Sequence, residues 1–167
     1  MAFVSKYSAH FEEPIIRNVL AIIARDFKEA LDYFYPTEDL KDFVERSIGT
    51  ERGLEFPMLV IGPRSNLIET DADLVSLIQP QIIQIRLAVV DSNPADAYLK
   101  AMKYVRALDA VLRSAEQSDY MAGMTSSTPF ALIIDVTHEY LPLGANDART
   151  SYVKPAELEL RLAFREL

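Results

Sequence analysis

The last ten residues of the chain, 158–167, read L-E-L-R-L-A-F-R-E-L and constrain the fold more than any other segment. Leucines fall on one side of this segment, whereas Glu159 and Arg161 fall on the other. Alternation with period two is typical of a β-strand that is buried on one face only. Because chain ends usually fray unless they are tied down, we expect this strand to be integral to a sheet, near an edge that meets another subunit.

The composition is that of one globular domain, since half of the 167 residues are hydrophobic and a quarter are charged. The chain has no cysteine, which excludes disulfides and thiolate chemistry. Its net charge of −8 opposes general binding to nucleic acid. No apolar run is long enough for a transmembrane helix, and the first residues do not resemble a secretory signal. We therefore expect a single domain, 1–167, made in the cytoplasm.

Helical periodicity predicts N-terminal helices over residues 14–48. Pro14 opens the first helix, and Tyr35-Pro36 ends it. Thr37 is a suitable cap for a second, shorter helix over 37–48, which Gly49 would end.

The remaining chain, 56–167, predicts a sheet-and-helix core with strands at 56–63, 82–91, 130–141 and the chain end. Asn93 caps a long helix from Pro94 to about Glu116. The buried stripe predicted for this helix consists of Tyr98, Leu99, Ala101, Met102, Val105, Leu108 and Leu112. Residues 64–80 and 143–155 show no convincing period and predict long irregular segments.

This order of elements predicts an α+β fold. We expect a mostly antiparallel four-stranded sheet, on which the central amphipathic helix and the N-terminal helices pack.

Catalytic and metal-binding motifs are weak in this sequence. His138 lies near Asp135 and Glu139, but strand geometry points the histidine to the opposite face from the two acids. We find no phosphate-binding loop and no nucleophile elbow. The acidic pairs Asp71/Asp73 and Glu157/Glu159 have the chemistry of hard-cation ligands, but solvation or pairing with Arg161 explains them better. We therefore expect no enzyme activity, no cofactor and no metal.

Three segments, taken in order, resemble one known family. They are Q-I-I-Q-I-R-L-A-V-V-D (81–91) followed by P-A-D-A-Y-L-K-A-M-K-Y-V-R-A-L-D-A-V-L (94–112), then I-I-D-V-T-H-E-Y-L-P (133–142), then A-E-L-E-L-R-L-A-F (156–164). With the N-terminal helices, this pattern resembles the tail terminator, or tail-completion, proteins of tailed bacteriophages, from about residue 14 to the end. The chain departs from compact members of that family in the segments 37–48 and 64–80, which make it longer and leave open another neck or tube-associated component.

The resemblance implies a virion structural protein, assembled in the host cytoplasm, that forms a ring, commonly a hexamer. Such a ring caps the tail tube and joins it to the head-tail connector or neck proteins, while DNA passes through the lumen without specific binding. On this interpretation, the polar strand faces are the candidate subunit interface, with residues Gln84, Arg86, Glu159, Arg161 and Arg165. The candidate ring-to-ring contact residues lie in the two irregular segments and are Arg64, Asn66, Glu69, Asp71, Asp73, Asn146, Asp147 and Arg149.

The sequence also fits a protein of a different functional class. The same elements suit a cytosolic ferredoxin-like binding or regulatory domain that dimerises through an edge strand. The two hypotheses require different oligomers: a ring for the tail terminator and a dimer for the ferredoxin-like domain.

Overall fold

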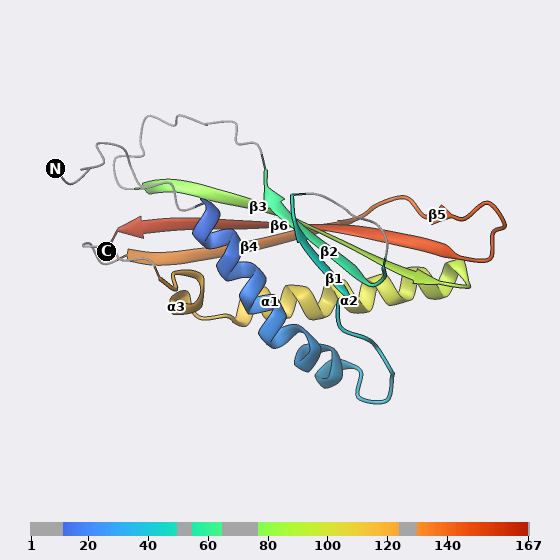
Figure 1. Ribbon diagram of the computed structural model, residues 1–167. Helices are drawn as coiled ribbons and strands as arrows, with labels where there is room; N and C mark the ends of the chain where they lie inside the picture. The colour runs from blue at the N-terminus through green and yellow to red at the C-terminus, as the bar shows by residue number, and fades with distance from the viewer. Residues whose placement is uncertain (1–11, 50–54, 65–76, 124–129, 167) are drawn as a thin grey trace.

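A computed structural model describes residues 12–49, 55–64, 77–123 and 130–166 (Figure 1). Side chains at residues 12, 77–80, 130 and 164–166 lie outside this description. In chain order the elements are α1 (Glu12–Phe34), β1 (Glu45–Ile48), β2 (Met58–Pro63), β3 (Leu77–Asp91), α2 (Pro94–Ser114), α3 (Gln117–Tyr120), β4 (Phe130–Tyr140), β5 (Gly144–Ala145) and β6 (Tyr152–Glu166). None of the described helices is long and apolar enough to span a lipid bilayer.

The described strands form one sheet in the order β1-β2-β3-β6-β4, and β5 pairs with β6 beyond the end of β4. The pairs β2–β3, β3–β6 and β6–β4 are antiparallel, whereas β1 is parallel to β2. The expected α+β class is confirmed. The expected strand count is wrong, because the described sheet has six strands and is mixed. Its four antiparallel strands β2, β3, β6 and β4 are the ones that the sequence predicts.

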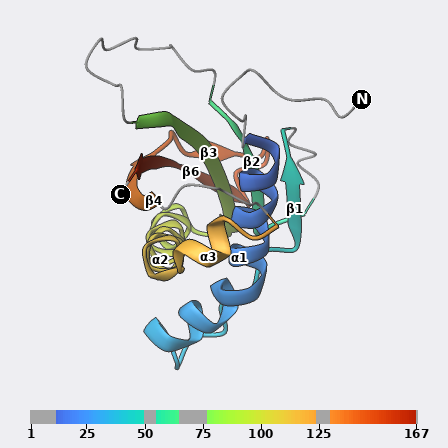
Figure 2. The same cartoon turned by 90° about the vertical axis from the view of Figure 1, so that its left-hand side faces the viewer.

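The long helix α2 connects two parallel strands that are not neighbours. Strands β3 and β4 both run antiparallel to β6, which lies between them, so they are parallel to each other. This arrangement is a split β-α-β unit. Figure 2 shows α1, α2 and α3 on the same side of the sheet, which leaves its other side without a helical cover among the described elements.

The helix predicted over 37–48 is absent, and a loop leads instead into β1. The Asp42 carboxylate accepts the Phe43 N–H at 2.7 Å, a local bond that competes with helix formation. The Val44 N–H donates to the Pro57 carbonyl at 2.8 Å, at the start of the β1–β2 pairing. Gly49 has a positive φ of 79°, as a helix-ending glycine would, but here it follows a strand. Pairing with β2 therefore outweighs the local helical pattern.

Aromatic side chains connect this loop to the helices. Phe43 stacks on Phe27 of α1 with ring centroids 4.3 Å apart, and both contact Tyr104 of α2. The Tyr104 hydroxyl donates to the Lys41 carbonyl, and burial raises the pKa of this phenol above its usual range. Phe43 is thus buried as the pattern predicts, although it does not belong to a helix.

Helix α2 has the expected start but a different buried stripe. The Asn93 side chain caps it by accepting the Ala95 N–H at 2.8 Å. The prediction that Tyr98, Leu99 and Met102 are core residues is wrong, because all three are exposed. The buried stripe is rotated around the helix and consists of Ala97, Ala101, Tyr104, Val105, Ala107, Leu108, Val111 and Leu112. Its three alanines are fully buried, in a helix that packs on both α1 and the sheet.

The closing strand β6 has the expected two faces, but it does not lie at an edge. Its residues Leu158, Leu160 and Leu162 are fully buried under the helices, so the prediction for the leucine face is confirmed. Strand β6 lies between β3 and β4, and β4 is the edge strand on that side. Any edge contact on this side of the sheet would therefore involve β4 rather than the chain end.

Two neighbouring substitutions in β6 test this division of faces. We expect Leu160→Ala to lower the free energy of unfolding by about 2–5 kcal/mol, because it leaves a cavity under α2. Its neighbour Arg161 points to the opposite face, so Arg161→Gln should change stability by no more than about 0.5 kcal/mol. Urea unfolding followed by circular dichroism measures both, and similar costs for the two variants would contradict the assignment of faces.

Candidate functional site: the open face of the sheet

The uncovered side of the sheet, which we call the open face, carries the candidate interface residues. Alternation along each strand and the pairing registers place on it, among the described residues, Glu45, Ser47, Met58, Val60, Gly62, Ile82, Gln84, Arg86, Ala88, Val90, Ala131, Ile133, Asp135, Thr137, Glu139, Val153, Pro155, Glu157, Glu159, Arg161 and Ala163. Four of the five residues predicted for the interface thus share one face. The side chain of the fifth, Arg165, lies outside the described residues, although its backbone pairs within β6.

Polar side chains of β3 and β6 pair with one another across the middle of the open face. Glu157 accepts hydrogen bonds from Gln84 Nε2 at 2.5 Å and from Arg86 Nη2 at 3.2 Å. Glu159 forms an ion pair with Arg64, which follows β2. The arginines are about half exposed, and exposed ion pairs contribute roughly 0–1 kcal/mol each. These pairs orient side chains on the surface more than they stabilise the fold.

Arg161 lies beside this network but is not part of it. It is exposed on β6, in register with Asp135 of the edge strand. In the ranges that the structure describes, its guanidinium makes no hydrogen bond or ion pair. Arg161 therefore has five donors available to a carboxylate from outside the chain.

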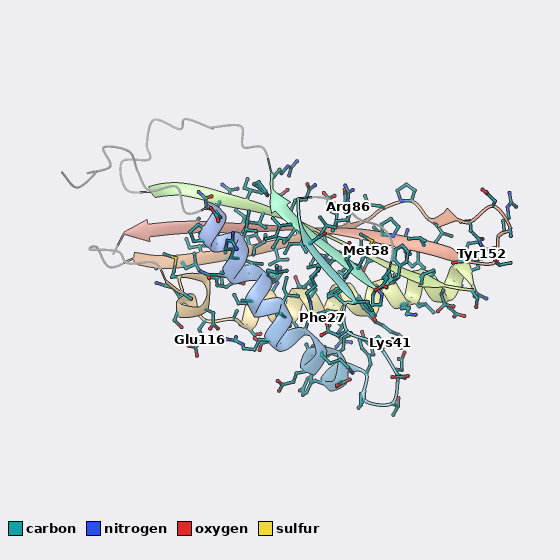
Figure 3. The ribbon with its side chains drawn as sticks, in the orientation of Figure 1. Phe27, Lys41, Met58, Arg86, Glu116 and Tyr152 are labelled. Atoms are coloured by element: carbon teal, nitrogen blue, oxygen red, sulfur yellow. The ribbon has the colours of Figure 1, made fainter. Side chains whose placement is uncertain are left out.

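A shallow apolar depression adjoins the network at the end of the sheet where β6 begins. The depression, which we call the open-face hollow, has a volume of about 230 Å³ and is lined by Phe56, Met58, Arg86, Leu87, Ala88, Leu141, Val153 and Pro155. Figure 3 labels Met58 and Arg86 on the sheet, with Phe27 in the helical layer. Among the residues lining the hollow, Arg86 is the charged one, and its bond to Glu157 holds it in place.

The candidate ring-to-ring residues separate into described and undescribed positions. Arg64 pairs with Glu159, whereas Asn66, Glu69, Asp71 and Asp73 lie outside the described residues.

The second candidate loop is ordered and short, which corrects the prediction of an irregular 143–155 segment. β5 and β6 flank a turn in which Asn146 Oδ1 accepts the N–H groups of Thr150 at 2.8 Å and Ser151 at 3.0 Å. The Asn146 side chain therefore builds the turn, and Asp147 and Arg149 are the candidates exposed beside it.

The outer edge of β4 is partly capped by side chains from the helical layer. The Leu141 N–H donates to the Pro155 carbonyl of β6. Odd-numbered residues of β4 therefore direct their backbone N–H and C=O groups toward β6, and even-numbered residues direct theirs away from the sheet. Of the outward groups, the Leu132 N–H donates to Gln117 Oε1 at 3.1 Å, and the Val136 carbonyl accepts from Arg113 Nη2 at 2.6 Å. Such cover limits strand pairing with another chain. Sequence reasoning did not identify Arg113 or Gln117, because a helical pattern shows no link to a distant strand.

The strand around His138 separates its candidate metal ligands. His138 lies on the helix side of β4, in register with Leu158, whereas Asp135 and Glu139 lie on the open face, as strand geometry predicts. No group of three or more His, Asp or Glu side chains in the described ranges is placed to hold a metal ion. What this face offers chemically is charge pairing and apolar contact with another macromolecule.

Comparison with known proteins adds no family assignment. The chain matches no protein-family model, and no curated protein is significantly similar to it.

Removing the caps on β4 tests their role as edge protection. We expect an Arg113→Ala/Gln117→Ala variant to self-associate more readily than the natural chain, because unpaired backbone groups at Leu132 and Val136 become free to pair. Light scattering over time at rising concentration measures this. Arg17→Ala is the matched control, since Arg17 is bonded to Glu13 at i,i+4 as Arg113 is to Asp109, but lies on α1. Equal behaviour of the two variants would contradict the capping role.

Proposed function

We propose that the chain is a ring-forming structural subunit of a tailed bacteriophage, a tail terminator that joins the tail tube to the neck. The observation that carries the proposal is the open face. A polar network, an arginine without a partner among the described residues, and an apolar hollow share this uncovered side of the sheet. A face of this composition suits contact with another protein. The resemblance of the chain to tail terminators in the order of its elements supports the same function.

The long strands suit a subunit that spans a ring from one side to the other. Strands β3 and β6 have 15 residues each, which corresponds to about 50 Å at roughly 3.3 Å per residue. The turn after Asn146 lies at the end where β6 begins, and the opposite end of the sheet is formed by the start of β4 and the end of β6. Arg64 lies near the middle, where its N–H donates to the Ile82 carbonyl and its side chain pairs with Glu159. Contacts at the two ends would serve the tube on one side and the neck on the other.

Function in such a ring needs shape and charge rather than catalysis. A head-to-tail interface closes into a ring when the rotation between subunits is a fraction of a full turn. The net charge of −8 would let DNA pass through the lumen without adhering, because like charges repel. The virion neck is accordingly the proposed location.

The alternative, a ferredoxin-like domain that dimerises through an edge strand, has one observation in its favour. The split β-α-β unit ends in β4, an edge strand of 11 residues. The caps from Arg113 and Gln117 count against pairing at that edge. A dimer that persists at all concentrations, together with a melting temperature raised by a metabolite, would favour this alternative.

Assembly state and a charge reversal on the open face test the proposal. We expect native mass spectrometry to show a closed oligomer, or negative-stain microscopy to show annuli once the tube protein of the same phage is added. Arg161→Glu should remain folded and reduce assembly at least about tenfold, since it removes the donors available to a partner carboxylate and places a like charge there instead.

Lys41→Glu is the matched control for this reversal, because Lys41 is also exposed but lies in the loop on the helical side. This variant should assemble normally. A chain that remains monomeric or dimeric, without annuli in the presence of tube protein, would contradict the ring, and normal assembly of Arg161→Glu would contradict this use of the open face.

A further inference from the structure

The N-terminal half of α2 presents apolar side chains outward. Tyr98, Leu99 and Met102 are 42%, 52% and 43% exposed, and their spacing places them on one side of the helix. We call these three residues the α2 patch. Exposed apolar side chains that are grouped on one surface indicate a contact site, whereas single ones are ordinary.

Tyr98 of the α2 patch is held in place by its surroundings. The Tyr98 ring lies 4.5 Å from the Lys154 ammonium and 5.5 Å from the Tyr140 ring, measured to ring centroids. Lys154 is itself buried and donates to the Leu141 carbonyl at 2.5 Å. A surface that is already ordered loses less conformational entropy when it binds.

The open-face hollow is the complementary feature. The hollow lies on the uncovered side of the sheet, and α2 lies on the other side, so the two cannot meet within one chain. A volume of about 230 Å³ is below the roughly 300–1,000 Å³ that is usual for small-molecule sites. The hollow therefore suits a few side chains from a protein better than it suits a metabolite.

Charge favours the same pairing of surfaces. Helix α2 carries four basic residues, of which Lys100, Lys103 and Arg113 form ion pairs with Asp91, Glu38 and Asp109 of the same chain. The fourth, Arg106, follows Met102 by one helical turn and has no acidic partner among the described residues, so it adds a positive charge beside the α2 patch. The described open face and its border have the opposite balance, with Arg64, Arg86 and Arg161 against Glu45, Asp135, Glu139, Glu157 and Glu159. Opposite charge on two surfaces steers them together and fixes their orientation.

We propose that the α2 patch of one copy docks into the open-face hollow of a second copy of this chain. Each copy has one of each surface, on opposite sides of the molecule, so the contact is head-to-tail and can repeat around a ring. The caps on β4 disfavour the competing symmetric contact, in which two edge strands pair. This inference rests on the proposed ring and names the contact that would form it.

Engineered cysteines test the contact, because the chain contains no cysteine of its own. We expect a Met102→Cys/Val153→Cys variant, treated with a short bis-maleimide under conditions where the natural chain forms oligomers, to give a ladder of covalent multimers. Each single variant alone should give no covalent multimers, since residue 102 meets residue 153 of the next copy. A mixture of the two single variants should stop at dimers. Met102→Cys/Thr37→Cys is the control and should give no ladder.

The outcomes separate this contact from the ring itself. Absence of the ladder while native mass spectrometry shows closed oligomers of the natural chain would overturn the contact and leave the ring standing. Dimers from Met102→Cys alone would also overturn it, because they require a symmetric contact between two α2 patches. Failure of the natural chain to form a closed oligomer, even with tube protein, would overturn the ring and this contact together.

Discussion

The antiparallel pairing of β3 with β6 is the interaction on which the remaining structure depends. It sets Ile83 and Ile85 beside Leu160 and Leu158, and all four are buried under the helices. Because side chains alternate, a slip of one residue in this register would turn every leucine of β6 to solvent and bury Glu159 and Arg161. Burial of the leucine face therefore also determines which charged groups appear on the open face.

One consequence is a molecule with two chemically different sides. The helical side includes α2, with three exposed apolar side chains and Arg106 one turn beyond Met102. The other side presents an acidic sheet surface with an apolar hollow. The exposed ion pairs of this face contribute little to stability. The edge of β4, the most obvious place for strand pairing, is partly occupied by the chain's own side chains.

The alternating and strongly capped segments could be predicted from the sequence, because their signals are local. The leucines of β6, the Asn93 cap and the strands around 56–63, 82–91 and 130–141 all appear in the structure. The opposite orientation of His138 and its acidic neighbours also follows from strand geometry alone.

The failures arise where tertiary contacts outweigh a local pattern. The segment 37–48 has a helical spacing of apolar residues, but pairing with β2 makes part of it a strand. On α2, two stripes fit the helical period, and contacts with α1 and the sheet decide which one is buried. The candidate interface residues Gln84, Arg86, Glu159 and Arg161 share one face of the sheet. The hollow beside them is lined by residues between 56 and 155, so no local sequence pattern predicts it.

In the proposed assembly, copies of this chain meet through opposite sides of the molecule. Hydroxyl-radical footprinting of dilute and assembled protein tests it most directly, with Tyr33 as an internal reference because that side chain is 80% exposed and lies on α1, outside both surfaces. The account requires oxidation of Tyr98, Leu99 and Met102 to fall on assembly while oxidation of Tyr33 is unchanged. An oligomer in which Met102 stays as reactive as in the dilute protein would contradict the account.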